Sequence, residues 1–481
     1  MTLLPVLILA AGTVAVLALD IAWPAARQAH LTLISLTLVA AAAATIPGIR
    51  MSPGDSLTAL CAPSGGLCLY EVSAAESLLQ LLACVSALLV VLLAWRDWAH
   101  GEGGRTAVLS ALLLAATTGV VALSGVGDVA SLLVAIELAT LPTVALVALE
   151  HRTRRQPGAI DAAVALLTTS LASFALLALG AALWFVSTGT AILSPEALIG
   201  QTGSDRVVLA LAGVFALAGI AFKLSAVPFH AWTPVTYAAA PLPITAYLST
   251  TSKVAAVGGL LVIVQAVTGA GISAVGVVLG VVAALSLTLG HVIALVQGDS
   301  VGLLAWSSVA QGGWVVLPLA TLAPGATSLA VGYLVIYLLA TMALWIVIVA
   351  FANDPARPDG TSMHWMRGIL RRQPALGLAM LFALLTLAGL PPAVAGLLAK
   401  IGVISPVAAQ GFWWLALVAA INVPLGLAVY LRWAWLILDP LPAPDSEAQV
   451  AKVFLPPLWS MVLGLLTAAL IALSIWPVMF R

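Results

Sequence analysis

Apolar runs of about twenty residues recur along almost the whole chain, and short polar segments separate them. A helix needs about twenty apolar residues to cross the ~30 Å hydrocarbon core of a bilayer. The pattern therefore predicts about 14 membrane-spanning helices. They are expected at 2–22, 29–48, 73–95, 106–124, 127–149, 159–187, 206–235, 241–267, 271–296, 301–321, 327–352, 374–410, 412–438 and 455–479.

Two of these runs, 206–235 and 374–410, are longer than one crossing requires and contain helix breakers. Pro228 and Pro234 lie in the first, and the Pro391-Pro392 pair lies in the second. Proline removes a backbone donor and clashes with the preceding turn, so both helices should be interrupted within the membrane. Interrupted helices at corresponding places in two halves are typical of inverted-repeat transporters, whose sites lie at the breaks.

Spans four to eight would then form one five-helix repeat, and spans nine to thirteen a second, inverted one. We expect four parts in chain order. They are an N-terminal three-helix segment (1–105), the first repeat (106–267), the second inverted repeat (271–438) and a C-terminal loop with the last helix (439–481).

Composition supports an all-α polytopic membrane protein. Hydrophobic residues make up 63% of the 481 residues and charged residues only 7%, whereas roughly a quarter of a soluble domain is charged. The lipid bilayer is therefore an expected partner. A formal net charge of zero offers no basic surface, so we expect no nucleic acid partner.

Lysine and arginine are unevenly distributed between the two sides of the predicted bundle. Most lie in odd-numbered loops: Arg27, Arg96, Arg105, Arg152, Arg154, Arg155, Arg357, Arg367, Arg371, Arg372 and Lys452. Positive residues mark the cytoplasmic side, which predicts that both termini lie outside. The first apolar run lacks a basic segment before it and a cleavage site after it, so we expect it to be retained as a span.

The cysteines offer no metal or cofactor site. Cys61 and Cys68 lie in a polar segment and Cys84 in an apolar run, without a C-x-x-C or Cys/His cluster. We therefore expect neither an iron–sulfur cluster nor zinc in this chain. If the polar segment faces an oxidising compartment, a Cys61–Cys68 disulfide is possible, but the spacing leaves two free thiols equally open.

Four charged residues fall deep within predicted spans: Glu137, Lys223, Lys253 and Lys400. Each costs at least ~2.5–3.5 kcal/mol at a span centre, so such residues usually face a polar interior and carry function. Burial favours the neutral amine of a lysine, and a nearby carboxylate favours the ammonium. A lysine between these two effects can load and release a proton, which makes the four residues candidates for proton translocation.

Glu137 and Lys223 are the natural modulating pair, which needs a separation of about 4–6 Å for strong coupling. The alternative is that the charges form static ion pairs that only fix helix packing. With three lysines and one deep carboxylate, pairing cannot neutralise them all. His230 and His291 are possible relays because histidine titrates near neutral pH. Each could equally be a hydrogen-bonded packing residue.

Several motifs resemble a known family. They are Phe222-Lys223-Leu224-Ser225-Ala226-Val227-Pro228-Phe229-His230-Ala231-Trp232-Thr233-Pro234, its continuation from Tyr237 to Lys253, Leu303-Leu304-Ala305-Trp306-Ser307-Ser308, and Gly389-Leu390-Pro391-Pro392 followed by Gly396 and Lys400. Together they resemble the antiporter-like subunits of bacterial respiratory complex I (NADH-quinone oxidoreductase), most of all the N subunit. The resemblance runs from about Ser124 to the end of the chain.

This resemblance implies a proton-translocating membrane-arm subunit in the bacterial plasma membrane. Glu137 would be the charge-coupling glutamate and Lys223 the central lysine of the first half-channel. Lys253 would link the halves, and Lys400 would be the lysine of the exit half. The chain would be a non-redox subunit of a translocase. Quinone, flavin and iron–sulfur clusters would belong to partner subunits, alongside the other membrane-arm subunits.

The chain departs from the family pattern at several positions. Ala163 stands where many N subunits have a lysine, and Val301-Gly302 where they have a Lys-Arg pair. Gln311 replaces a histidine, His291 an asparagine, and Val235 an acidic residue. The chain therefore resembles a divergent N subunit. The alternatives are a subunit of a multisubunit cation/proton antiporter or membrane-bound hydrogenase, and a structural membrane subunit that has lost pumping.

Overall fold

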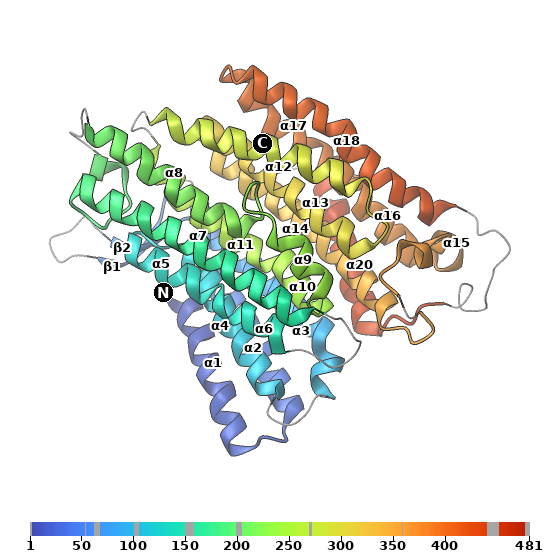
Figure 1. Cartoon of the computed structure of the whole chain (residues 1–481). Coiled ribbons are helices and arrows are strands. Elements are labelled where there is room, and N and C mark those ends of the chain that lie inside the picture. Colours follow the sequence, from blue (N-terminus) through green and yellow to red (C-terminus); the bar gives the residue numbers. More distant parts are fainter. Residues whose placement is uncertain are drawn as a thin grey trace. The chain divides into compact units, whose positions relative to one another are not determined.

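The computed structural model of the chain is shown in Figure 1. It describes residues 2–52, 54–61, 68–100, 105–149, 158–198, 204–268, 272–357, 359–439 and 452–476. The chain divides into two compact units. Unit 1 comprises Met1–Ser225 and Phe229–Leu279, and unit 2 comprises Ala226–Pro228 and Gly280–Arg481.

Unit 1 is helical apart from one hairpin. Its elements are α1 (Leu4–Ala22), α2 (Arg27–Ile49), β1 (Leu57–Cys61), β2 (Cys68–Val72), α3 (Ala74–Ala99), α4 (Arg105–Leu123), α5 (Val129–Leu138), α6 (Leu141–Leu149), α7 (Ala159–Thr188), α8 (Ser204–Leu224), α9 (Trp232–Ala239), α10 (Leu242–Ser249) and α11 (Thr251–Val267), with a 3-10 turn at Pro195–Leu198. Helices α7 and α8 run side by side along most of their length (Figure 1).

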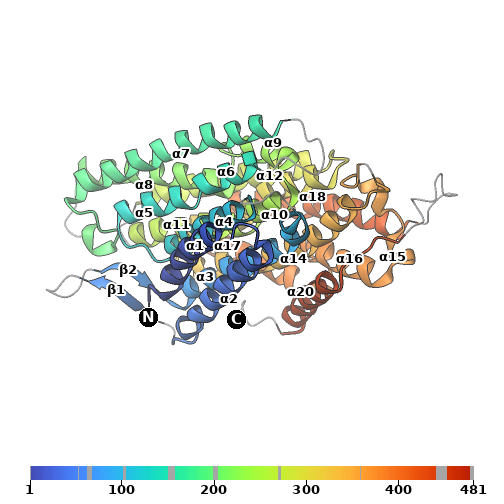
Figure 2. The same ribbon diagram turned by 90° about the horizontal axis from the view of Figure 1, so that it is seen from below.

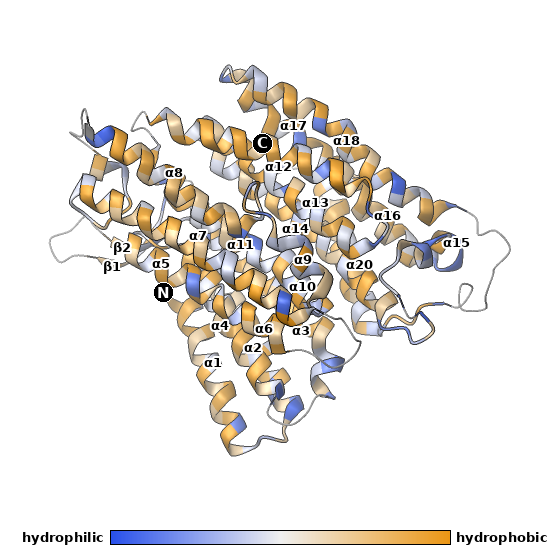
Figure 3. Cartoon of the chain, in the orientation of Figure 1, coloured by the Kyte–Doolittle hydropathy of each residue, from blue (hydrophilic) through white to orange (hydrophobic). Residues whose placement is uncertain are grey.

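Apart from Ala226–Pro228, unit 2 begins within α12 (Ser273–Ala294). It continues with α13 (Ser300–Val316), α14 (Ala326–Ala352), α15 (Ile369–Arg372), α16 (Pro374–Ala388), α17 (Val394–Ala409), α18 (Trp413–Leu438) and α20 (Pro457–Ile475), with 3-10 turns at Leu317–Thr321 and Met363–Met366. Its long helices are mainly apolar, whereas α15 and the loop before it are more polar (Figure 3).

Thirteen segments of the described chain are long and apolar enough to cross a membrane. The shorter apolar helices α16 and α17 occupy the remaining predicted span, 374–410. The predicted fold class, an all-α polytopic membrane protein of about 14 spans, is thereby confirmed. The predicted orientation stays a prediction, and Arg152, Arg154, Arg155 and the two terminal residues lie outside the described residues.

Helices α5 and α13 begin in the same way. Asp128 lies before α5 and accepts hydrogen bonds from Ala130 N and Ser131 N, both at 2.9 Å. Asp299 lies before α13 and accepts hydrogen bonds from Val301 N at 3.0 Å and Gly302 N at 3.3 Å. Aspartate at this position satisfies backbone donors that have no partner within the helix. The polar residue at each start therefore fixes where the apolar span begins.

Both predicted interruptions occur. The chain leaves helical geometry between α8 and α9, at 225–231, and between α16 and α17, at 389–393. Pro228 lies in the first break, but Pro234 is the third residue of α9, where proline sacrifices no intrahelical hydrogen bond. Gly389 ends α16 with a φ of 80°, a conformation that glycine adopts at little cost.

Two further interruptions were not predicted. The span 127–149 divides into α5 and α6 at Ala139 and Thr140, and the span 241–267 divides into α10 and α11 at Thr250. Threonine hydroxyls bind the carbonyls left at both breaks: Thr140 Oγ1 donates to Ile136 O, and Thr250 Oγ1 donates to Ala246 O, each at 2.6 Å. Pro142, the second residue of α6, follows the first break and has no N–H to continue the helix from Leu138, whereas no proline or glycine lies between Ile244 and Val257 around the second.

The β1–β2 hairpin is also absent from the prediction (Figure 2). Its two strands pair antiparallel, and a disulfide joins Cys61 to Cys68, the first of the two alternatives that the spacing left open. Strand β2 attaches to the connection between α4 and α5, where Glu71 N donates to Gly125 O at 2.8 Å and Gly127 N to Leu69 O at 2.9 Å. The hairpin thus ties the start of α3 to the start of α5.

We expect Gly396→Ala to destabilise unit 2. A Cβ at Gly396 would lie 1.9 Å from Thr386 O, across the α16–α17 interruption. Overpacking of this kind costs about 1–3 kcal/mol, and a clash with backbone cannot be relieved by a rotamer change. Thermal unfolding in detergent should show a lower Tm for Gly396→Ala. Gly464→Ala is the control because no atom lies within 4 Å of its Cβ; equal Tm values for the two variants would contradict the prediction.

Candidate functional site

Lys223 lies in the last turn of α8 and is 2% exposed. Its Nζ donates to Ala139 O and to Thr140 Oγ1, both at 2.8 Å. These acceptors form the break between α5 and α6. A helix that ends leaves carbonyls without intrahelical partners and carries partial negative charge there. The interruption of this span therefore supplies the binding site for the Lys223 ammonium.

Glu137 is the penultimate residue of α5 and is half-buried. Its carboxylate interacts electrostatically with the Lys223 ammonium, yet the two form no direct ion pair in the part of the chain that the structure describes. The side chains around it on α5 and α6 are apolar and exposed: Val134 is 68% exposed and Leu141 46%. The structure thus brings Glu137 and Lys223 to the same break, with the carboxylate on a partly open face.

Lys253 is the third residue of α11 and is 1% exposed. Its Nζ donates to Leu224 O, the last carbonyl of α8, at 3.0 Å and to Ser225 Oγ. The same Nζ lies 5.6 Å from the centre of the Trp232 ring, an arrangement that stabilises a cation. Lys253 therefore binds the end of the helix that carries Lys223, and the two ammonium groups interact electrostatically.

Lys400 repeats this arrangement in unit 2. It lies in the second turn of α17 and is 2% exposed. Its Nζ donates to Ala388 O, the last carbonyl of α16, at 2.7 Å, and lies 5.4 Å from the centre of the Trp314 ring. A Cβ at Gly389 would approach the Lys400 side chain to 3.1 Å, so glycine leaves room for the lysine at the break.

The three lysines share one kind of binding partner. Each binds a carbonyl at the C-terminal end of an interrupted helix, and none forms an ion pair with a carboxylate among the described residues. Static ion pairs between helices are therefore not how these lysines are held. A helix end can accept a hydrogen bond from an ammonium or from a neutral amine. The arrangement thus tolerates loss of the proton without leaving a buried carboxylate unpaired.

The two histidines lie in different surroundings. His230 is half-buried in the break between α8 and α9, where its backbone O accepts from Thr233 N at 2.9 Å. His291 lies on α12 and is fully buried, and its Nδ1 lies 3.1 Å from Asn422 Oδ1. The structure therefore places His230 at the interruption that ends the Lys223 helix, and His291 inside unit 2.

The departures from the family pattern occupy apolar or uncharged positions. Ala163 is a buried residue of α7, and Val301-Gly302 forms the first turn of α13. Gln311 is fully buried, where its Oε1 accepts from Tyr333 OH at 2.6 Å and its Nε2 donates to Tyr430 OH at 2.8 Å. Sequence reasoning missed this network because its members come from three helices. It contains no group that is charged at neutral pH.

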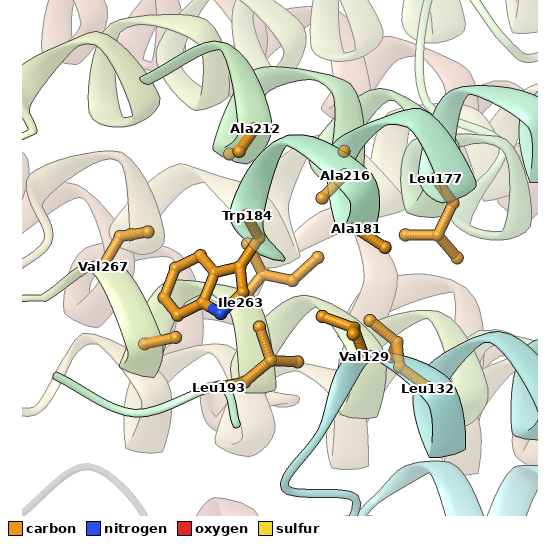
Figure 4. A pocket seen from close by; sticks show the side chains of 13 residues that line it. Val129, Leu132, Leu177, Ala181, Trp184, Leu193, Ala212, Ala216, Ile263 and Val267 are labelled. Carbon is orange, nitrogen blue, oxygen red and sulfur yellow. The ribbon is translucent and has the colours of Figure 1, made fainter. Parts of the chain in front are cut away.

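A pocket in unit 1 lies apart from these residues (Figure 4). Helices α5, α7, α8 and α11 contribute its walls, among them Val129, Leu177, Trp184 and Ile263. Its lining side chains are apolar and include no group that could carry a proton. In the described residues no cluster of three or more His, Cys, Asp or Glu side chains could hold a metal ion. The candidate site is therefore the set of buried lysines.

Residues 126–426 match the family model described as "NADH:quinone oxidoreductase/Mrp antiporter, TM". The chain belongs to this family. The resemblance found in the sequence motifs is thereby confirmed, and the matched region includes Glu137, all three buried lysines and both histidines. It also contains every helix interruption described above.

Relatives within the family point to complex I. The chain is 37% identical over 455 residues to NADH-quinone oxidoreductase subunit N 2 of Streptomyces griseus, covering 92% of this chain and 83% of that protein. It is 41% identical over 340 residues to subunit N of Salinispora tropica, covering 67% of this chain but only 63% of that protein. These relatives indicate a membrane-arm, antiporter-like subunit of complex I.

Solved structures share the fold over nearly the full length. A chain of respiratory complex I from Thermus thermophilus, with bound aureothin, superposes with a TM-score of 0.80 at 28% identity, covering 98% of this chain and 97% of that one. A chain of the Mrp complex from Dietzia gives a TM-score of 0.84 at 21% identity, covering 99% of this chain and 95% of that one. At that identity the second likeness shows the fold alone.

Proposed function

We propose that this chain is a membrane-arm subunit of an NADH-quinone oxidoreductase-type complex and translocates protons through Lys223, Lys253 and Lys400. The observation that carries the proposal is the binding of all three lysines to helix ends rather than to carboxylates. Partner subunits would hold the flavin, iron–sulfur clusters and quinone site and supply the redox energy. The complex would lie in the bacterial plasma membrane, with both termini of this chain outside.

Proton loading in unit 1 follows from the charges around α8. Burial favours the neutral amine, whereas a negative charge on Glu137 favours the Lys223 ammonium. Lys253 binds the end of the same helix, so the positive charge of one protonated lysine disfavours protonation of the other. A charge change near Glu137 would therefore alter the occupancy of Lys223 and, through it, that of Lys253. Lys400 provides the corresponding site in unit 2.

The surroundings of Glu137 support a neighbouring subunit. The carboxylate is half-buried on a face that also carries exposed Val134, Leu138 and Leu141. Facing lipid, a carboxylate at mid-span would cost several kcal/mol. A partner subunit that covers this face would remove that cost and place its own charges close to Glu137. The charge change that drives Lys223 would then come from the partner.

The second candidate is a subunit of a multisubunit cation/proton antiporter, which the family description and the fold both accommodate. A membrane-bound hydrogenase subunit or a structural subunit without pumping would also share this fold. These alternatives differ in what drives proton movement. NADH oxidation should move protons through the chain only in the first case.

The experiment is proton translocation by the purified complex in liposomes, with the wild-type chain or with Lys400→Met. Methionine keeps most of the side-chain volume but cannot carry a proton. We expect NADH-driven acidification to fall by more than half while the complex still assembles and oxidises NADH. If the complex that copurifies with this chain has no NADH-quinone activity, or if Lys400→Met pumps at the wild-type rate, the proposed function is wrong.

A further inference from the structure

His291 has a fixed orientation inside unit 2. Its Nδ1 lies 3.1 Å from Asn422 Oδ1, and Asn422 Nδ2 donates to Thr288 Oγ1 at 3.1 Å and to Val418 O at 3.0 Å. Because the amide nitrogen is used as a donor elsewhere, the amide oxygen accepts from the imidazole. Nδ1 therefore carries the hydrogen, and the neutral ring presents a lone pair at Nε2.

The Nε2 atom is buried and has no hydrogen-bond partner among the described residues. Opposite it lies Gly426 of α18: a Cβ there would come within 2.9 Å of Nε2. Any other residue would place a side chain against Nε2. Buried acceptors in proteins are normally paired with protein groups or with ordered water, so water is the natural partner for this unpaired Nε2.

Two groups near His291, Trp314 and Lys400, have N–H donors without an acceptor among the described residues. The Trp314 ring centre is 6.5 Å from that of His291, and its Nε1 is buried without a partner in the described part of the chain. Lys400 Nζ lies 5.4 Å from the centre of the Trp314 ring and makes one hydrogen bond, to Ala388 O, although an ammonium has three donors. Buried water typically makes two to four hydrogen bonds, and these groups supply that number.

We propose that His291 exchanges protons with Lys400 through water held beside Gly426 and Trp314. The inference rests on the proposed function and names the partner of Lys400 in unit 2. In the exchange an N–H bond of the Lys400 ammonium breaks and an N–H bond forms at His291 Nε2, with water carrying the proton between them. The positive charge moves from lysine to imidazole, and Asn422 Oδ1 keeps its hydrogen bond from Nδ1 throughout.

The groups around Lys400 and His291 offer no better acceptor for the Lys400 proton. Lys400, on α17, interacts electrostatically with His291. Trp314 of α13 and Asn422 of α18 are uncharged. The Tyr333 ring stacks on the Trp314 ring, with 6.2 Å between the ring centres, but the Tyr333 hydroxyl donates to Gln311 Oε1. An amide cannot pass a proton on as a histidine can, so the tyrosine network is a poor route. Among these groups His291 is the one suited to accept the proton of Lys400.

The test compares His291→Gln and Gly426→Ala with wild type in NADH-driven proton translocation across a pH series. Glutamine can form hydrogen bonds but does not titrate. We expect His291→Gln to lower pumping at least tenfold, since a proton-transfer group typically contributes ~10²–10⁴-fold to a rate, and to remove one inflection from the pH profile. Gly426→Ala should lower pumping by crowding Nε2. Gly464→Ala, at an open position, should pump like wild type.

Nitrogen-15 NMR of histidine-labelled complex gives a readout independent of pumping, with the His291 signal assigned by its loss in His291→Gln. We expect a neutral ring with hydrogen on Nδ1, and a signal at Nε2 that changes in Lys400→Met. A hydrogen on Nε2 would overturn the inference. Normal pumping by His291→Gln, beside loss of pumping in Lys400→Met, would overturn the relay and leave the proposed function standing. Normal pumping by both variants would overturn both.

Discussion

Lys223→Met is expected to reduce NADH-driven proton translocation about tenfold or more, while the complex still assembles. A proton-transfer group typically contributes ~10²–10⁴-fold to a rate, and Lys223 is the lysine that the structure brings to the same break as Glu137. The variant removes the bonds from Nζ to Ala139 O and Thr140 Oγ1. Inverted membrane vesicles with a pH-sensitive dye would measure the loss directly.

Lys223→Arg separates proton transfer from simple charge. Arginine keeps the positive charge and can bond the same acceptors, but it is not deprotonated in proteins. If Lys223 loads and releases a proton, the arginine variant should also fail to pump. Full activity with arginine would show that a fixed charge at the α5–α6 break is enough. Arg206→Met, at an exposed position in the first turn of the same helix, is the control for charge removal.

The sequence predicts the interruptions at 225–231 and 389–393 because proline and glycine act locally. Pro228 and the Pro391-Pro392 pair cannot continue a helix, and nothing elsewhere in the chain is needed to see that. The break at Thr140 also has a local signal, Pro142 at the second position of α6, whereas the break at Thr250 has no proline or glycine nearby. Lys223 binds the carbonyl exposed at the first, and such a partner leaves no periodic signal in the apolar run that it interrupts.

The same distinction applies to the site. Buried charge is visible from the sequence, since a lysine amid twenty apolar residues stands out, and the structure does place Lys223, Lys253 and Lys400 inside. Their partners are not visible, because a backbone carbonyl has no residue identity. The sequence suggested one carboxylate, Glu137, as the partner of Lys223, and it gave no sign of the helix ends that the three lysines bind. The Gln311–Tyr430 contact joins residues 119 positions apart and has no local signal either.

Glu137→Gln is expected to weaken pumping and to shift its pH dependence to lower pH by roughly one unit, the lower end of the effect of a nearby opposite charge. The amide has the same shape but lacks the negative charge that favours the Lys223 ammonium. More protons are then needed in solution to load Lys223. Acidification rates across a pH series would show the shift, and Glu71→Gln on the exposed face of β2 is the matched control.

The double variant decides whether the two residues act together. If Glu137 acts through Lys223, adding Glu137→Gln to Lys223→Met should cause no further loss, because interacting residues are not additive. An additional loss would mean that Glu137 acts on another group, such as a charge on the partner subunit that we propose covers its exposed face. An unchanged pH profile in the single variant would separate Glu137 from proton loading altogether. The half-buried carboxylate would then serve only to join this chain to its neighbour.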